Sequence, residues 1–476
     1  MNRVDKIYWS IFALGAVLRL IDLGHAELWY DEAFSAWVAS LPVDHLLIAL
    51  SGDTHPPLYY LLLHSLVSLG LDSDFWLRVP STLFSLAAIP LLYGIGYMLR
   101  FSDVARLGAV GFMAISSAQI HYAQEARMYT LFQAEILLVV LLILRRSPVG
   151  VFLAMLTALY THNYALIYGP VLALILYARE RKITSLWPLC TAVFFWLPWA
   201  GVLVGQMRTI SGGYWIQQIT WGAQVYALYM QFLGFATPDQ WKIVTVISFL
   251  SVTFLACVRV IQTRHTGGLM MLALGLAPLS LAIIVSIGWV PILLFRALLP
   301  SSGALYLICA YVLTRGPRWQ TAYAAMLVLP LTLSGLFGHY RYNPINKGDL
   351  KTLVALMRLE WQPGDLILHI NDSTVVTFHR YAHDLRPQYK LSPCEQEPLG
   401  SLSTVTRAGL GIVEISSNDL PDRYWIVWAD SPVSPACEEQ AAQTLIANAR
   451  LYKLELDSKL FYGGVWVYDK NQVRSP

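Results

Sequence analysis

The chain has 476 residues, of which 56% are hydrophobic and 13% are charged, and its formal net charge is +3. Soluble globular domains carry about 25% charged residues, so this composition excludes an ordinary soluble enzyme and indicates a protein with several membrane spans. The small, scattered positive charge gives no reason to expect a nucleic-acid partner.

The first apolar segment, residues 7–23, follows Arg3 and Lys6. No small-residue cleavage site follows it, and Asp31 and Glu32 come soon after, so we interpret it as an uncleaved first span and not as a signal peptide. A spanning helix needs about 20 apolar residues, and the chain offers about 11 such segments. The predicted spans are 7–23, 79–99, 105–121, 127–144, 149–161, 163–178, 185–204, 241–259, 269–287, 292–313 and 319–337.

The segment 57–70 is apolar but short, and it follows two prolines. If it lies along the membrane surface as a juxtamembrane amphipathic helix, all basic loops share one side, as the positive-inside rule requires. The N-terminus is then cytoplasmic, and the protein is a multi-pass protein of the plasma (inner) membrane. The basic loops contain Arg3/Lys6, Arg100/Arg106, Arg145/Arg146, Arg179/Arg181/Lys182, Arg259/Arg264 and Arg315/Arg318.

The composition changes near residue 340. We therefore predict a transmembrane domain over 1–339, with a first outer loop at 24–78, and an extracytoplasmic α/β domain over 340–476. Helices are expected at 349–359 and 437–449, and strands at 365–370, 424–428 and 464–468, because these runs are apolar and lie between turn residues. Cys394 and Cys437 are the two cysteines of this tail, and in an oxidising compartment they are expected to form a disulfide.

Two adjacent carboxylates, Asp31 and Glu32, follow the first span. Ionisable groups near a bilayer are costly, and for that reason they usually serve a function. Desolvation beside an apolar surface raises the basicity of a carboxylate, so these residues are candidates for taking a proton from an attacking hydroxyl or amine. The structural alternative is that Asp31 is the N-cap of a helix over 33–40.

A second group of polar residues, Asp53 and His55, precedes two prolines and is expected to border the same outer cavity as Asp31. The alternative is a simple turn. These three side chains could also hold a divalent cation, but the pattern is weak, and we predict neither a metal nor another cofactor.

Further candidates lie at the outer ends of later spans. Glu125 and Arg127 either form an ion pair that fixes two helix ends or bind substrate. Arg78, Arg127 and Arg296 are candidates for a lipid phosphate, because a guanidinium group donates to two oxygens at once. Snorkelling is the alternative for Arg78, and His162 is either a satisfied interfacial histidine or a ligand.

Nucleotide and zinc motifs are not found: there is no Walker loop, no Rossmann glycine fingerprint and no HExxH pair. A site on the outer face has no supply of cytoplasmic nucleotide. A glycosyl transfer there would need a donor that is carried by a lipid.

Several short motifs together give the chain a recognisable pattern. They are Trp29-Tyr30-Asp31-Glu32-Ala33, His55-Pro56-Pro57-Leu58-Tyr59-Tyr60, Arg78-Val79-Pro80-Ser81, Tyr122 to Tyr129, and Arg296 followed by Pro300. In their order and spacing the chain resembles the polytopic glycosyltransferases of the GT-C superfamily, in the branch of bacterial protein O-mannosyltransferases and the aminoarabinose transferase of lipid A.

The resemblance implies a transferase that uses a polyprenyl-phosphate-linked sugar on the outer face, commonly with inversion. It implies a catalytic role for Asp31, with Glu32 beside it. In the second outer loop it implies a role for Glu125, accompanied by Arg127 and Tyr129. Together with the candidates taken from the residues themselves, the predicted substrate-binding residues are His55, Tyr59, Arg78, Glu125, Arg127, Tyr129, His162 and Arg296.

One feature departs from the aminoarabinose-transferase branch, which places a lysine near the juxtamembrane helix to hold the donor phosphate. No lysine occurs between Leu41 and Arg100, so an arginine would have to replace it.

The expected partners are the donor, a lipid, glycan or protein acceptor, and membrane lipids. A transporter or flippase of a lipid-linked saccharide is the rival class, but transporters usually place polar residues near the midplane and contain repeats. A non-catalytic scaffold is the third hypothesis.

Overall fold

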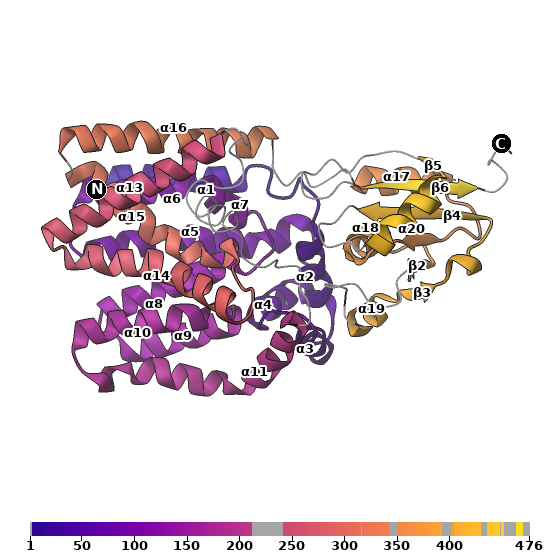
Figure 1. The fold of residues 1–476 in the computed structure, drawn as a ribbon, viewed down its shortest axis with the longest axis horizontal. Coiled ribbons are helices and arrows are strands. Elements are labelled where there is room, and N and C mark those ends of the chain that lie inside the picture. The colour runs from indigo at the N-terminus through magenta and orange to yellow at the C-terminus, as the bar shows by residue number, and fades with distance from the viewer. Residues whose placement is uncertain are drawn as a thin grey trace.

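The structure is a computed structural model that describes residues 2–211, 241–315, 317–342, 350–392, 402, 404–429, 436–447, 449–451 and 463–469. Within these residues the chain forms a helical part and a smaller sheet domain, which lie end to end (Figure 1). Most of the helices of the first part run side by side along the long axis of the molecule.

The helices of the first part follow one another with short connections. They are α1 (Arg3–Leu20), α2 (Tyr30–Ser40), α3 (Val43–Ser51), α4 (Leu58–Ser68), α5 (Asp74–Met98), α6 (Asp103–Ile115), α7 (Ser117–Ala123), α8 (Tyr129–Leu144), α9 (Pro148–Thr161), α10 (Ala165–Glu180), α11 (Trp187–Ser211), α13 (Lys242–Thr263), α14 (Thr266–Gly288), α15 (Leu299–Arg315) and α16 (Arg318–Tyr342). Two 3₁₀ turns, Ile183–Leu186 and Phe295–Leu298, precede α11 and α15.

Six helical segments of the described ranges are long and apolar enough to cross a membrane. They are Asp74–Met98, Ile183–Met207, Ile243–Thr263, Thr266–Gly288, Phe295–Arg315 and Arg318–Arg341. The chain is therefore a multi-pass membrane protein, as predicted. The count of about 11 spans stays a prediction, because α8, α9 and α10 have 16, 14 and 16 residues.

One predicted span, residues 105–121, is not a continuous helix. The segment 105–121 is divided into α6 and α7 at Ser116, whose backbone is extended. The buried guanidinium group of Arg19 donates to the carbonyl oxygens of Met113 and Ala114, at 2.9 and 3.0 Å. These bonds satisfy carbonyls at the end of α6 that a continuous helix would have bonded internally.

The basic loops gather at one end of the helical part, as the charge pattern predicted. Arg179 donates to the carbonyl of Leu144, and Arg259 donates to the carbonyl of Arg315. The start of α1 and the connection between α15 and α16 lie at this end, away from the sheet domain (Figure 1). The assignment of this end to the cytoplasm stays a prediction.

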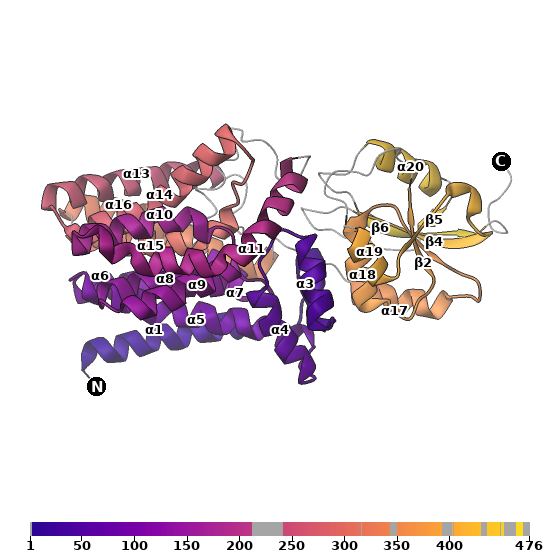
Figure 2. The same cartoon turned by 90° about the horizontal axis from the view of Figure 1, so that it is seen from below.

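Three helices, α2, α3 and α4, lie at the opposite end, next to the sheet domain (Figure 2). Helix α4 has 11 residues, a length of about 16 Å, which is about half of the hydrocarbon thickness of a bilayer. The interpretation of the segment 57–70 as a juxtamembrane helix stays a prediction. Residues 205–211, which lie between the predicted spans 185–204 and 241–259, belong to α11, and residues 212–240 lie outside the described ranges.

The sheet domain has six strands in the order β3-β2-β1-β4-β6-β5. Strands β1 to β4 are parallel, whereas β6 is antiparallel to β4 and β5. The strands are β1 (Ile367–His369), β2 (Gln388–Leu391), β3 (Val413–Ile415), β4 (Arg423–Ala429), β5 (Arg450–Leu451) and β6 (Gly463–Asp469). The helices are α17 (Leu350–Glu360), α18 (Val375–Tyr381), α19 (Thr404–Leu410) and α20 (Ala436–Ala447).

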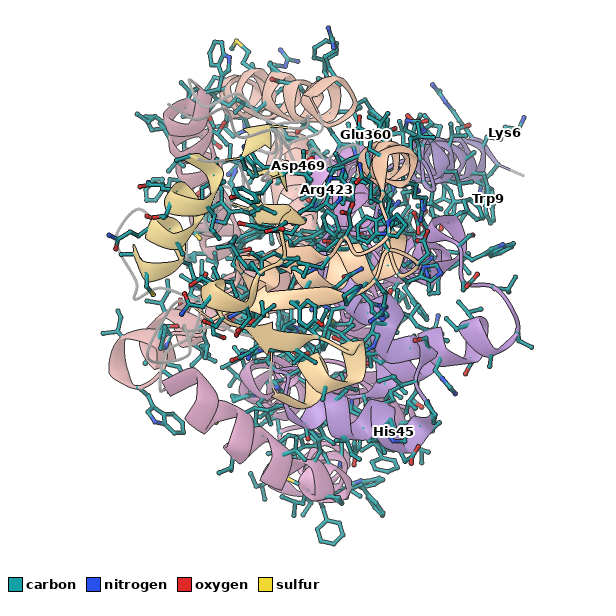
Figure 3. The ribbon with its side chains drawn as sticks, turned by 90° about the vertical axis from the view of Figure 1, so that its right-hand side faces the viewer. Lys6, Trp9, His45, Glu360, Arg423 and Asp469 are labelled. Carbon is teal, nitrogen blue, oxygen red and sulfur yellow. The ribbon has the colours of Figure 1, made fainter. Side chains whose placement is uncertain are left out.

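Helices cover both faces of this sheet, as in an α/β domain. Ile367 and Phe378 belong to one buried cluster, whereas Leu368 and Ala442 belong to the cluster on the other face. Figure 3 looks onto this domain and shows Arg423 near Glu360 and Asp469. Arg423 donates to the Glu360 carbonyl at 3.1 Å and lies 3.8 Å from the Asp469 carboxylate.

The predicted helices and strands of the tail are confirmed, and the strands β2, β3 and β5 were not predicted. The division of the chain at residues 339 and 340 stays a proposal. Cys437 is disulfide-bonded. Cys394 lies outside the described residues, so the predicted pair of Cys394 and Cys437 stays a prediction.

Candidate active site

Seven of the candidate residues come from five separate segments that meet at the end of the helical part next to the sheet domain. Helix α2 supplies Asp31 and Glu32, and the α3–α4 connection supplies His55. The segment from α7 to the first turn of α8, the α9–α10 connection and the 3₁₀ turn before α15 supply the others. These are Arg127, Tyr129, His162 and Arg296.

Glu32 has a structural position in the first turn of α2. Its side chain is 0% exposed, and its carboxylate accepts from the backbone N–H of Trp29 at 3.3 Å and of Ala126 at 2.8 Å. The first of these bonds belongs to the capping arrangement of α2, in which Trp29 is the N-cap. The expectation that Asp31 is the N-cap is wrong, because α2 already begins at Tyr30.

Arg78 forms a two-pronged ion pair with Glu32, in which Nε and Nη2 donate at 2.8 and 2.9 Å. Its remaining N–H groups donate to the carbonyls of Leu23, Ala26 and Glu27. All five guanidinium hydrogens of this buried arginine therefore have protein acceptors. The pair ties the loop before α2 to α5, and Arg78 has no hydrogen left for a substrate.

Asp31 lies beside Glu32 but faces a different set of partners. One carboxylate oxygen, Oδ2, is 3.0 Å from Nη1 of Arg296 and 3.9 Å from Nη2 of Arg127. The Asp31 side chain is 18% exposed, so it is the more accessible of the two adjacent carboxylates. A single carboxylate thus lies between two guanidinium groups.

Arg127 is held in place by neutral acceptors. Its Nη1 donates to the Asp31 carbonyl at 3.2 Å, to Ser35 Oγ at 3.1 Å and to the Tyr60 hydroxyl at 3.1 Å. A guanidinium group stays protonated in proteins, and the nearby Asp31 carboxylate stabilises its charge. Arg127 therefore keeps its charge inside the site.

His55 forms a dyad with Asp53, and Arg127 fixes the tautomer of its ring. The Nε2 atom lies 3.4 Å from Nη2 of Arg127, which can only donate, so Nε2 accepts. The hydrogen of His55 is then on Nδ1 and is donated to Asp53 at 3.1 Å. Burial lowers the pKa of His55 despite the opposing effect of Asp53, and a neutral ring agrees with this arrangement.

The pKa of Asp53 moves in the direction that the dyad requires. Burial would raise it, but the His55 imidazole and the Arg127 guanidinium outweigh burial, so this pKa lies below its ordinary value. Asp53 therefore stays ionised and can accept the hydrogen of His55 Nδ1. The expected proximity of Asp53, His55 and Asp31 is confirmed.

The buried hydrogen-bond donors of the site that have no partner among the described residues include one on His162 and one on Tyr129. His162 accepts the backbone N–H of Tyr164 through Nδ1 at 3.1 Å, so its hydrogen is on Nε2, and this atom makes no hydrogen bond. The Tyr129 hydroxyl is likewise unpartnered. The His162 ring lies 5.6 Å from the His55 ring and 5.9 Å from the Tyr129 ring. The ring of Tyr129 is 5.4 Å from the guanidinium carbon of Arg296.

Glu125 does not pair with Arg127, so the expectation of an ion pair between them is wrong. Its Oε1 lies 3.0 Å from Nε2 of His121, one helical turn earlier. Tyr122 links this pair to the site, because its ring lies 5.5 Å from the ring of Tyr129. Glu125 therefore belongs to a neighbouring cluster, on the α7 side of Tyr129.

Tyr59 stabilises the backbone of the site, because its hydroxyl lies 2.8 Å from Ser81 Oγ, and Ser81 donates to the backbone carbonyl of Arg127.

Two residues near the site, Tyr60 and Trp29, were not among the residues predicted to act in it. Tyr60 is part of the quoted His-Pro-Pro motif, and the Trp29 ring lies 5.8 Å from the guanidinium carbon of Arg296. The sequence signal for Trp29 was its position as an aromatic residue two positions before the candidate carboxylate of Asp31.

The residues that the structure describes contain no group of three or more His, Cys, Asp or Glu side chains able to hold a metal ion. In the cation alternative, His55 would be one of three ligands. Both of its nitrogens are already in contact with protein groups.

The comparison with solved structures concerns the fold. The chain is a multi-pass membrane protein with a GT-C glycosyltransferase-like fold and a C-terminal α/β domain. The structure is similar to that of the aminoarabinose transferase ArnT from Cupriavidus metallidurans in the apo state, with a TM-score of 0.64 and 12% identity over 100% of both chains. It is also similar to ArnT from the same organism bound to undecaprenyl phosphate, with a TM-score of 0.58 and 12% identity over 98% of both chains.

Sequence comparison adds nothing to this likeness. No family model matches the chain, and no curated protein matches it. The resemblance inferred from the motifs is confirmed at the level of the fold.

Proposed function

We propose that this protein is a glycosyltransferase that moves a sugar from a polyprenyl-phosphate-linked donor to a lipid, glycan or protein acceptor at the outer face of the plasma membrane. The observation that carries the proposal is the arrangement around Asp31. One partly exposed carboxylate lies between two buried arginines, next to two buried donors, on Tyr129 and His162, that have no described partner.

Arg127 and Arg296 hold the donor phosphate. Guanidinium groups bind phosphate oxygens in pairs of parallel hydrogen bonds, and these two already converge on one anionic group, Asp31. The Tyr129 hydroxyl and His162 Nε2 supply further hydrogen bonds. Buried donors without partners are costly, so a ligand that satisfies them gains affinity. Arg78 and Glu32 fix the loop that carries Asp31.

The reaction is a single displacement at the sugar C1. The acceptor oxygen or nitrogen forms a bond to C1, the bond from C1 to the phosphate oxygen breaks, and its electron pair leaves with the lipid phosphate. Asp31 takes the proton of the acceptor. The phosphate needs charge stabilisation and no proton, and the arginines supply it, so the proposal requires no metal or other cofactor. One displacement inverts C1 of the transferred hexose or pentose.

Two further observations support the proposal. A structural neighbour of known activity, the aminoarabinose transferase ArnT, was solved with undecaprenyl phosphate, which is a lipid of the class proposed here for the donor. In addition, the site lies at the end opposite the basic loops. The positive-inside rule assigns the basic end to the cytoplasm, so the site and the sheet domain are extracytoplasmic.

The decisive experiment compares Asp31→Asn with the wild type and with Asp44→Asn. Asp44 is an exposed carboxylate on the adjacent helix α3, so it is a matched control. The purified chains are reconstituted in liposomes with a panel of radiolabelled undecaprenyl-phosphate sugars and an extracted envelope lipid fraction as acceptor. Asp31→Asn is expected to lose transfer about 100-fold or more, while it still binds undecaprenyl phosphate and Asp44→Asn retains activity. Full transfer by Asp31→Asn would reject the role of Asp31.

The same liposomes separate the transferase from a flippase. A flippase moves the labelled lipid between leaflets and forms no new glycosidic bond, whereas the proposed enzyme releases undecaprenyl phosphate. Movement of the donor without any release would contradict the proposal. Binding of the donor with neither movement nor release would favour the scaffold hypothesis.

A further inference from the structure

One contact between the sheet domain and the loop that precedes Asp31 is made by a tyrosine. Tyr381, the last residue of α18, accepts a hydrogen bond from the backbone N–H of Leu28 at 2.7 Å and donates to Asp74 Oδ2 at 2.9 Å. Burial and the neighbouring Asp74 raise the pKa of Tyr381, so its hydroxyl keeps the hydrogen that it donates. Leu28 lies three residues before Asp31.

Asp74 is the centre of this contact. It is the first residue of α5 and is 7% exposed. In addition to Tyr381, it binds Lys351 Nζ at 2.7 Å and Arg380 Nη2 at 3.3 Å. All three partners belong to the sheet domain. Arg78, one turn further along α5, holds the same loop through its carbonyl contacts, so the loop before α2 is fixed from both sides.

A second contact holds α2 further along its length. A Cβ atom built on Gly409 of α19 would lie only 2.8 Å from Cζ2 of Trp37, so this glycine allows α19 to approach the indole ring. Val375, Val376 and Leu410 of the sheet domain belong to the same hydrophobic cluster as the core of the helical part. Helices α18 and α19 lie on the side of the domain that faces α2 and α3 (Figure 2).

An apolar interface of this kind opposes the relative motion that is otherwise expected between domains. Glu27 adds a further connection, because its carboxylate accepts the backbone N–H groups of Leu350 and Lys351 at the start of α17. The residues that immediately precede the catalytic helix are therefore bonded to the sheet domain at two points, Glu27 and Leu28.

We propose that the sheet domain positions the catalytic loop, and that Tyr381 is the positioning residue, because its hydroxyl sets the place of Leu28 and hence of Asp31 at the start of α2. This inference rests on the proposed function of Asp31. Tyr381 touches no reacting atom and acts through the backbone of residues 28–31. The sheet domain thereby contributes to catalysis indirectly, through the position of Asp31.

The test is Tyr381→Phe in the full-length chain, which keeps the ring and removes the hydroxyl. Lys351→Met is the matched control, because it removes another contact to Asp74 but leaves the bond to Leu28 intact. We expect Tyr381→Phe to lower kcat about 10- to 100-fold, with little change in KM for the undecaprenyl-phosphate donor, and Lys351→Met to stay close to the wild type.

Amide hydrogen exchange supplies a readout that does not depend on the reaction. Peptides over residues 29–36 are expected to exchange faster in Tyr381→Phe and not in Lys351→Met, whereas the core of the sheet keeps its protection. Unchanged exchange and unchanged kcat in Tyr381→Phe would overturn the proposal. Equal losses of kcat in both variants would also overturn it, because they indicate a general effect of docking.

The two proposals fail in different ways. If the wild type transfers no sugar from any donor, the proposed function fails, but the exchange experiment still decides whether Tyr381 fixes the loop. A second variant, Gly409→Ala, disturbs the Trp37 contact alone, with the exposed Ala408→Ser on the same helix as its control. If α2 is positioned by the sheet domain, Gly409→Ala lowers kcat and Ala408→Ser does not. Wild-type kcat in Gly409→Ala would contradict positioning through α19.

Discussion

Asp31 and Glu32 are neighbours in the chain, yet their surroundings differ in kind. Glu32 is completely buried, and its carboxylate receives two bonds from Arg78 and two from backbone N–H groups. Asp31 is partly exposed and lies between Arg127 and Arg296 in a site that contains unpartnered donors. A satisfied buried group contributes to stability, whereas an unsatisfied one is retained at a cost.

The same difference separates two buried histidines. His369 of β1 uses both ring nitrogens, towards Thr374 at 2.8 Å and Gln388 at 3.2 Å. His162 uses only Nδ1. In these two pairs, hydrogen-bond satisfaction separates the saturated groups Glu32 and His369 from the candidate site residues Asp31 and His162, where burial alone does not.

The largest expected effect is on stability, at Glu32. Glu32→Gln leaves the charge of Arg78 buried without its partner, and breaking a buried ion pair costs about 3–5 kcal/mol. Thermal unfolding in detergent is expected to begin at a much lower temperature than in the wild type. The exposed Glu360→Gln serves as control and should unfold close to the wild type, and Asp31→Asn, whose carboxylate is partly exposed, should lose less stability than Glu32→Gln. If Asp31→Asn were destabilised as strongly as Glu32→Gln, the comparison would be wrong.

The second prediction concerns pH and the sheet domain. Burial lowers the pKa of His369 from 6.5 to about 4. Between these two pH values the unfolded chain therefore binds a proton at His369 that the folded chain does not bind. The stabilisation is fully present above pH 6.5 and is lost progressively as the pH falls towards 4, by about 3 kcal/mol in total. Hydrogen exchange of the sheet at pH 7.5 and pH 5 measures this loss.

His369→Gln should reduce the difference between the two pH values, because glutamine does not titrate. His45→Gln, at an exposed position of α3 in the helical part, should leave it as in the wild type. An equal pH effect in wild type and His369→Gln would assign the acid sensitivity to another group. Neither substitution is expected to alter kcat at pH 7.5.

The third prediction concerns the proposed phosphate site around Asp31, and it tests the role of Arg296. Arg296→Lys keeps the positive charge but loses the planar fork that binds two phosphate oxygens. We expect KM for the donor to rise about 10- to 100-fold, which corresponds to the loss of one charge-assisted hydrogen bond, with little change in thermal stability. Arg318→Lys, at the exposed start of α16, is the control. An unaltered donor KM in Arg296→Lys would remove Arg296 from the phosphate site.

The sequence predicted the fold where the signal is local. The strand over 424–428 is an apolar run, and buried parallel strands have this pattern, so β4 was found. Strand β2 was missed because it contains Lys390, whose charge is buried only because Glu438, 48 positions away, lies 3.7 Å from it. The break at Ser116 was missed for the same reason, since the stabilising Arg19 belongs to another helix.

The site shows the same limit. The motifs predicted which loops converge, and Asp31, His55, Arg127 and Arg296 do lie together. The sequence could not separate Arg78 from these residues. Whether an arginine is saturated depends on carbonyls and carboxylates that come from distant parts of the chain, and only the folded structure brings them within hydrogen-bond distance.

The last prediction has the smallest effect but opposite signs for stability and function. The Tyr129 hydroxyl is buried and has no described partner, and such a group costs about 1–3 kcal/mol. Tyr129→Phe removes it, so the empty protein should be as stable as the wild type or slightly more stable. If the hydroxyl binds the donor phosphate, the same change should weaken binding of undecaprenyl phosphate about fivefold to tenfold.

Tyr59→Phe provides the matched control for Tyr129→Phe, because the Tyr59 hydroxyl is equally buried but already bonded to Ser81. Its loss should lower the stability, since it removes a satisfied hydrogen bond and leaves Ser81 with one partner fewer. Thermal unfolding with and without undecaprenyl phosphate measures both effects on the same samples. If Tyr129→Phe is destabilised like Tyr59→Phe, then the Tyr129 hydroxyl is hydrogen-bonded in the folded protein. In that case a missing hydrogen-bond partner gives no evidence for a functional role of Tyr129.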